Sequence, residues 1–329
     1  MKVGEARAVA ARWVAAHRVA GFAGAYVSGS AAWSPAGAEL AATSDVDIVI
    51  LVTGEVPDKI GKLRHQGVLL DVAYAPLEPA ENVLASPALA AGLSRGVILA
   101  DPHGSLAALH ATVAGRFAHP RWVRARCAAL EDRIAALDRL DTTRPLAERV
   151  LSWVFPASLP AVVVLTAAGA NPTVRRRYAA AREVLIGCGE AGFHEELLGL
   201  LGCADLSAAR VTTHLDRLAD VYDHVSRDPA GPYAGDLTPQ ARRISIDGTR
   251  DLVEHGLHRE AVWWIVVTLA RCLTSAPHRA GVLGELLDDL GAGTPAAMRH
   301  RARAAVAALP RLRLMREALM RRPCPGPAP

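Results

Sequence analysis

Two short segments near the N-terminus carry the residues best suited to chemistry. Ser28 ends a β-like run and is followed by Gly29 and Ser30, and Asp45 and Asp47 begin a second run. Glycine lets a turn offer its backbone N–H groups to phosphate oxygens at close range, and serine hydroxyls add donors. Two carboxylates spaced two apart on a strand share one face and repel each other unless cations lie between them. The combination suits a phosphate chain bound through Mg²⁺.

A third carboxylate, Asp71, lies in the apolar run 68–75. An unpaired carboxylate is costly to bury among apolar side chains, so Asp71 needs a partner. If this run pairs beside the strand that starts at Asp45, Asp71 can ligate a metal with Asp45 and Asp47 or take the proton from an attacking hydroxyl. The sequence therefore predicts a three-aspartate site on neighbouring strands.

This pattern resembles the polymerase-beta-type nucleotidyltransferase superfamily over roughly residues 20 to 100. The family pattern is a Gly-Ser turn, an Asp-x-Asp strand and a third acidic residue on a neighbouring strand, and all three parts are present in order. The resemblance implies that Gly29 and Ser30 bind the triphosphate. It also implies that the three aspartates hold two Mg²⁺ ions. The full set expected to bind nucleotide in this segment is Ser28, Gly29, Ser30 and Ser44.

Within the superfamily the chain looks most like the small-molecule, aminoglycoside-type enzymes. That resemblance implies transfer of a nucleoside monophosphate, with ATP as the expected donor, to a hydroxyl of a small molecule and release of pyrophosphate. Three alternatives stay open: an RNA-directed enzyme, a protein-directed enzyme, and a catalytically silent nucleotide-binding regulator. The sequence predicts neither the acceptor nor the oligomeric state.

A second candidate segment, residues 171–178, joins two apolar helical stretches and contains Arg175, Arg176 and Arg177. These arginines are expected at a helix start. Small-molecule nucleotidyltransferases commonly carry a basic residue, usually lysine, at this place, and it reaches the nucleotide phosphates. The resemblance implies that role for the arginines, and a solvated arginine cluster is the alternative.

The charge distribution argues against a long nucleic acid as partner. Residues 1–100 carry a net charge of −1 and the remainder +5. A nucleic-acid-binding domain normally concentrates its basic residues in a stripe. Here arginines alternate with acidic residues, as in the stretch 124–139, which is typical of solvated helix faces.

Neither a membrane segment nor a metal-binding cysteine pattern is evident. No uninterrupted apolar stretch reaches the ~18 residues of a transmembrane helix, and no Lys/Arg-led apolar segment opens the chain. The five cysteines are widely spaced, so we expect reduced thiols, mostly in the core. A cytoplasmic protein without a membrane partner is the expectation.

The hydrophobic patterns and the resemblance together predict an α+β fold. A small mixed nucleotidyltransferase sheet with flanking helices is followed by an all-helical bundle region. A helix over 5–20 should cover the sheet, and only one face of the strand 45–52 is expected to be core. The predicted domains are a catalytic domain at 1–105, a helical bundle at 106–228 and a further helical region at 238–322. The predicted strands are 25–28, 45–52, 68–75 and 97–100.

In the last helical region, Thr238-Pro239 and Thr294-Pro295 have the form of an N-cap followed by proline in the first turn. Trp264 is expected in the core, and the Pro-rich tail from 323 to 329 is expected to be mobile. The helices predicted there are 239–255, 258–275 and 295–320.

Overall fold

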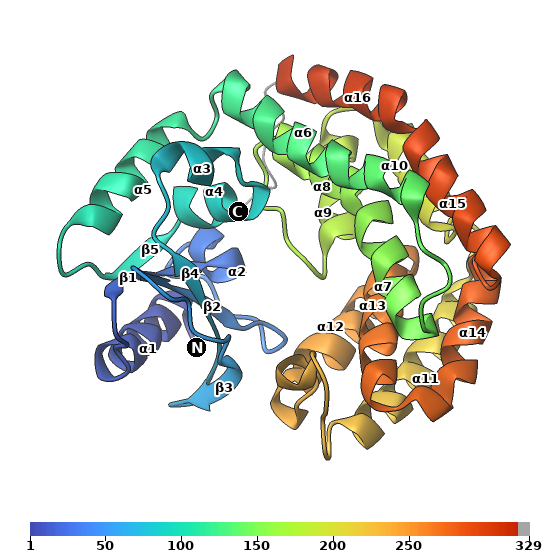
Figure 1. Ribbon diagram of the computed structural model, residues 1–329, viewed down its shortest axis with the longest axis horizontal. Helices are drawn as coiled ribbons and strands as arrows, with labels where there is room; N and C mark the ends of the chain where they lie inside the picture. The colour runs from blue at the N-terminus through green and yellow to red at the C-terminus, as the bar shows by residue number, and fades with distance from the viewer. Residues whose placement is uncertain (322–329) are drawn as a thin grey trace. The chain divides into compact units, whose positions relative to one another are not determined.

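The computed structural model describes residues 1–321. The chain divides into two compact units, Met1–Arg126 and a second one that begins at Cys127. All five strands lie in the first unit, and the described part of the second unit is helical, which confirms the α+β class with a helical C-terminal region (Figure 1). The division lies beyond residue 105 because α5 (Ser105–Arg116) and the start of α6 (Pro120–Ala135) pack with the sheet residues.

The strands form one mixed sheet in the order β3-β4-β2-β1-β5. Strand β1 pairs antiparallel with β2 and β5, whereas β4 pairs parallel with β2 and antiparallel with β3. Four strands were predicted, but β3 was not. The strands are β1 (Phe22–Ser28), β2 (Val46–Val52), β3 (Gly61–His65), β4 (Val68–Pro76) and β5 (Val97–Ala100).

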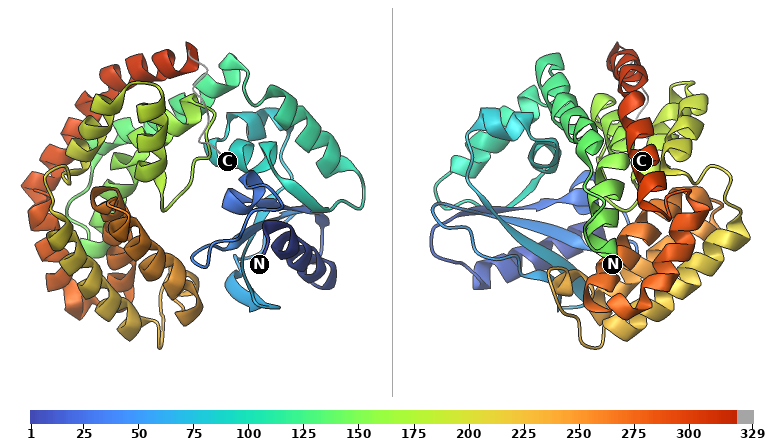
Figure 2. Two further views of the ribbon diagram at one scale, coloured as in Figure 1. Left: turned by 180° about the vertical axis from the view of Figure 1, so that it is seen from behind. Right: turned by 45° about the vertical axis from the view of Figure 1, so that its right-hand side comes forward.

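Helices cover both faces of the sheet (Figure 2). On one face Ile48 and Ile50 pack with Trp13 of α1, which confirms that the first helix covers the sheet. On the other face Leu51 packs with Leu84 in a second buried cluster. The prediction that only one face of the second strand is core is therefore wrong, because its apolar residues continue on both faces beyond Asp47. The helices are α1 (Val3–Ala16) and α2 (Gly29–Trp33) on the first face, and α3 (Ala80–Ala85), α4 (Pro87–Ser94) and α5 on the second.

Helix α13 (His258–Ser275) forms the centre of the second unit. Trp263 is fully buried and Trp264 is 8% exposed, which confirms the core position predicted for Trp264. Trp263 donates its indole N–H to the carbonyl of Val154 at 3.2 Å. The other α-helices are α7 (Leu146–Ala157), α8 (Leu159–Ala167), α9 (Arg177–Gly187), α10 (Ala191–Leu201), α11 (Ala208–Val225), α12 (Gly248–Glu254), α14 (Ala280–Asp289), α15 (Pro295–Ala307) and α16 (Leu309–Arg321).

Two of the predicted C-terminal helices are interrupted. The range 239–255 contains a 3₁₀ turn, a π-helical turn and α12, and the range 295–320 divides at Ala308 into α15 and α16. Pro310, at the start of α16, lacks the N–H that a continuous helix would need. Both predicted N-caps are present, since Thr238 and Thr294 accept hydrogen bonds from backbone N–H groups three residues on.

One stretch, Leu146–Ala167, is long and apolar enough to cross a membrane by composition, and 83% of its most apolar window is buried inside the structure. Such burial is typical of helices in the core of a folded unit.

Three cysteines, Cys127, Cys203 and Cys272, are buried free thiols as predicted. Cys188 is disulfide-bonded, so the prediction of a reduced thiol is wrong there. Cys324 and the tail predicted to be mobile lie outside the described residues.

The short helix α2 is held by Arg7 of α1. The Arg7 guanidinium donates to the carbonyl of Ala31 from Nε at 2.9 Å and from Nη2 at 2.6 Å, and Nη2 also donates to the carbonyl of Ser34 at 2.6 Å. The last carbonyls of any helix lack partners within that helix. Arg7 donates the hydrogen bonds that these carbonyls lack, and it thereby holds α2, the helix that begins at Gly29, in place.

Arg7→Ala should lower the free energy of unfolding of the first unit by about 1–3 kcal/mol, because it removes charged hydrogen bonds to partly buried carbonyls. The matched control is Arg12→Ala on the same helix, whose guanidinium contacts only the exposed Gln66 side chain in the described residues. Its effect should stay within about 0.5 kcal/mol. Urea unfolding followed by circular dichroism measures both, and equal losses would contradict this role of Arg7.

Candidate metal and phosphate site

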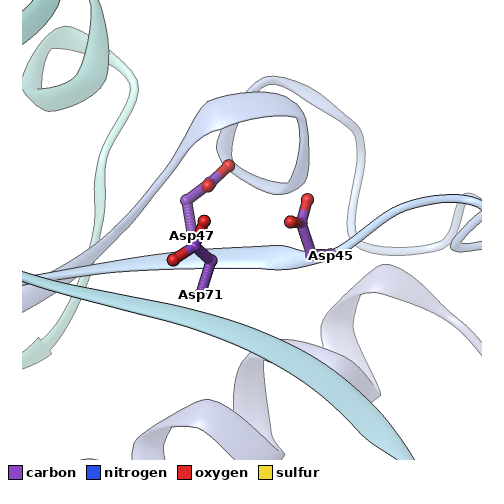
Figure 3. A group of neighbouring side chains, drawn as sticks. All are labelled: Asp45, Asp47 and Asp71. Carbon is purple, nitrogen blue, oxygen red and sulfur yellow. The ribbon is translucent and has the colours of Figure 1, made fainter. Parts of the chain in front are cut away.

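Three carboxylates meet on one side of the sheet. Strands β2 and β4 are parallel neighbours, and their register places Asp47 directly beside Asp71. Asp45 precedes β2 by one residue, and the period of the strand turns it to the same side as Asp47. One carboxylate oxygen from each residue lies within 4.8 Å of the others, as Figure 3 illustrates. The predicted pairing of these strands is confirmed, and it brings the three aspartates together.

The turn after β1 lies against the Asp47 carboxylate. Gly29 has a φ of +61°, in the left-handed region that favours glycine. A Cβ atom at this position would lie 1.9 Å from Asp47 Oδ2. Ser28 is also the register partner of Asp47 across the β1–β2 ladder. Gly29 is therefore required both by its backbone conformation and by the space that the carboxylate occupies.

The three predicted serines lie in different surroundings. Ser30 Oγ and Ser44 Oγ are 3.3 Å apart in an exposed hydrogen bond. The Ser28 hydroxyl instead lies against helix α4, where a Cβ atom on Gly92 would be 2.6 Å from it. Ser30 and Ser44 thus offer a pair of hydroxyls close to the Gly29 turn, whereas Ser28 packs against a helix.

Two lysines that the sequence analysis did not single out bind the aspartates. Lys62 of β3 is the register partner of Asp71, and its Nζ donates to Asp71 Oδ2 at 2.7 Å and to Asp45 Oδ2. Lys59 Nζ lies 2.9 Å from Asp71 Oδ1. The signal available in the sequence was the glycine-containing pair Gln66-Gly67 directly before the apolar run 68–75, because a two-residue turn of this kind joins the strands of a hairpin. A hairpin there places Lys62 opposite Asp71.

The electrostatic surroundings of Asp47 and Asp71 differ. Burial, and then the negative charges of Asp45 and Asp71, raise the pKa of Asp47 to about 7. Burial also acts to raise the pKa of Asp71, but Lys62 and Lys59 outweigh it, so that pKa is lowered. For Lys62, burial acts to lower the pKa, and the two carboxylates outweigh it and raise it. The lysines thus stabilise the Asp71 charge, whereas burial and the two neighbouring carboxylates disfavour the charged form of Asp47.

The donor set fits a hard divalent cation. All three candidate ligands are carboxylates, which are the ligands that Mg²⁺ and Mn²⁺ prefer. A positive group, the Lys62 ammonium, already lies between Asp45 and Asp71. Burial and the two neighbouring carboxylates raise the pKa of Asp47, so a bound cation would stabilise its charged form. Asp45, Asp47 and Asp71 are therefore the residues that would hold the metal.

The predicted arginines lie in the second unit at the start of α9, as expected. Arg175 donates to the carbonyl of Gly248. Arg176 is about half exposed and lies 3.7 Å from Glu183.

Arg177 does not belong to a solvated cluster. It is 6% exposed, and its Nη1 donates to Ser158 Oγ at 2.6 Å. The guanidinium carbon lies 3.6 Å from the ring centre of Trp263. Burial lowers the pKa of Arg177 to about 9. Its side chain is thus part of the core of the second unit.

No protein-family model matches the chain, and no curated protein matches it significantly. The functional assignment therefore depends on the residues and geometry of the site.

Gly29→Ala should disturb the three-aspartate site, because its Cβ would collide with the Asp47 carboxylate. The matched control is Gly54→Ala, since Gly54 also has a positive φ, +97°, but a Cβ there meets nothing within 4 Å. Both variants carry the left-handed backbone cost of about 1–2 kcal/mol. Only Gly29→Ala should also weaken Mn²⁺ binding, on the order of tenfold or more, in calorimetry. Equal behaviour of the two variants would show that the contact with Asp47 has no consequence.

The Asp47 carboxyl should make the metal-free chain less stable as pH rises. Its pKa is about 7 when folded and 3.8 without the fold, so folding takes up a proton between these values. Its contribution is most favourable below pH 4 and is lost as pH rises to about 7, with a slope of at most about 1.4 kcal/mol per pH unit.

Asp47→Asn in EDTA should therefore gain stability relative to the parent chain between pH 5 and 8. Asp71→Asn should lose stability at neutral pH, because the folded pKa of Asp71 is lowered and its contribution is present above pH 3.8. Urea unfolding at several pH values measures both. Parallel pH curves for the parent chain and Asp47→Asn would contradict the assigned environment of Asp47.

Proposed function

We propose that this chain is a Mg²⁺-dependent nucleotidyltransferase. It moves a nucleoside monophosphate, AMP from ATP, to a hydroxyl of a small molecule and releases pyrophosphate. The observation that supports this is the group of three carboxylates within 4.8 Å of one another, beside a Gly29 turn that contacts Asp47. A cytoplasmic location without a membrane or nucleic-acid partner belongs to the same proposal.

Asp45, Asp47 and Asp71 would hold two Mg²⁺ ions, which when bound offset the charge of the triphosphate and of the attacking oxygen. Lys62 and Lys59 lower the pKa of Asp71. A carboxylate with a lowered pKa is a weak base and a good charged ligand. With both lysines in place, Asp71 therefore has the properties of a charged ligand.

The nucleotide phosphates have donors near the aspartates. The Gly29 turn contributes its backbone, and the hydroxyls of Ser30 and Ser44 lie 3.3 Å apart at an exposed position. Of Arg175, Arg176 and Arg177, Arg176 keeps the predicted role of phosphate ligand, because its side chain is 51% exposed. Arg177 has the role of a core residue.

The proposal is tested with the purified chain, Mg²⁺, each of the four nucleoside triphosphates and a metabolite extract. Pyrophosphate release is followed, and the nucleotidylated product is identified by mass. Asp45→Asn serves as the inactive control. Binding of nucleotide without pyrophosphate release under any condition would instead support a silent regulator. Transfer of the nucleotide to protein or RNA would show that the acceptor is a macromolecule and not a small molecule.

Asp45→Asn and Asp47→Asn should each lower turnover on the order of a hundredfold or more, because each loses a charged ligand where negative charge develops. Asp71→Asn should slow transfer far more than it weakens the binding of a non-hydrolysable ATP analogue, measured by calorimetry. Glu81→Gln, which changes an exposed acid of α3, should leave the rate of transfer and the binding of the analogue unchanged. Equal losses of rate and binding in Asp71→Asn would make Asp71 a structural partner only.

A further inference from the structure

Lysine is rare in this chain, and two of its three positions are at the three-aspartate site. Of the 37 basic residues, 34 are arginine and three are lysine. Two of the three, Lys59 and Lys62, contact the Asp71 carboxylate. The guanidinium of arginine binds a carboxylate with a planar two-donor fork, whereas the ammonium of lysine is a compact, strongly hydrated charge on a flexible stem. A chain that uses arginine almost everywhere thus has, at this site, the cation that is easier to displace.

Lys62 is the more deeply placed of the two. Its side chain is 11% exposed, and the Asp45 and Asp71 side chains are 16% and 12% exposed. The ammonium donates to one oxygen of each. Lys59 is 46% exposed and contacts Asp71. Lys62 therefore uses oxygens of two of the residues that would hold a metal.

We propose that Lys62 is the counter-ion of the metal-free triad, and that a divalent cation is bound only when the Lys62 ammonium leaves Asp45 and Asp71. This inference rests on the proposed metal role of the aspartates. An ammonium at 2.7 Å from Asp71 Oδ2 repels an incoming cation and occupies carboxylate lone pairs. Free metal therefore binds weakly.

The displaced ammonium needs a new acceptor, because a partly buried charge without a partner is costly. Phosphate oxygens are strong acceptors for an ammonium. A metal ion that arrives with a nucleoside triphosphate brings such an acceptor with it, whereas a free metal ion brings none. Lys62 thus makes the site selective for the metal–nucleotide complex over the metal alone.

The first test is the affinity for Mn²⁺ alone, measured by calorimetry. Lys62→Met should bind Mn²⁺ at least tenfold more tightly than the parent chain and should melt at a lower temperature without metal. Arg64→Met is the matched control, since Arg64 carries the same charge on the same strand and bonds the carbonyl of Gly67. It should change the affinity by less than about threefold. Lys62→Arg, which keeps the charge, should not tighten Mn²⁺ binding.

The second test observes the ammonium directly in the unmodified protein. With only three lysines, ¹⁵N-lysine labelling yields at most three side-chain signals in an ammonium-selective NMR spectrum. Mg²⁺ with a non-hydrolysable ATP analogue should shift the Lys62 signal and leave that of Lys2, which pairs with Glu39, unchanged. Mg²⁺ alone at the same concentration should shift it much less.

Unchanged or weaker Mn²⁺ affinity in Lys62→Met, or a Lys62 signal that stays in place with Mg²⁺ and the analogue bound, would overturn this inference alone. An equal gain in Arg64→Met would also overturn it, because the effect would then be one of net charge. If neither the parent chain nor Lys62→Met binds Mn²⁺, the metal role of the aspartates fails and the proposed function fails with it. If Lys62→Met does not fold, Lys62→Arg and the NMR measurement decide the question.

Discussion

The first unit is organised around the repulsion of like charges held close together. Lys62, Asp71, Asp47 and Ser28 follow one another in register across four strands of the sheet. Two carboxylates side by side in this row destabilise the fold unless positive charge is near. One end of the row supplies that charge through Lys62, and the other end leaves space for the carboxylate through Gly29. The site is a property of the sheet and not of a single loop.

The row depends on the register of β2 against β4. A slip by one residue would turn Asp47 to the opposite face, because side chains alternate along a strand. Both faces of β2 oppose such a slip. Ile48 and Ile50 are buried against α1 on one face, and Leu51 is buried on the face that also carries Asp47. Core packing on both sides therefore maintains the alignment of the charged groups.

The three aspartates and the Gly29 turn were predictable because they lie in strongly patterned strands, where spacing alone decides which side chains share a face. Strand β3 was not predicted from the sequence, because its five residues include two basic side chains and one histidine and show little apolar alternation. Because β3 was not predicted, the contacts of Lys62 with Asp45 and Asp71 were not predicted either. Arg177 was expected near phosphate or solvent, but its burial depends on Ser158 and Trp263, residues far along the chain that no local pattern connects to it.

The close approach of Gly29 to Asp47 links two positions that lie far apart in sequence. A larger residue at 29 fits only if the side chain at 47 becomes shorter or moves away. In the divergence of related chains the two positions are thus expected to change together.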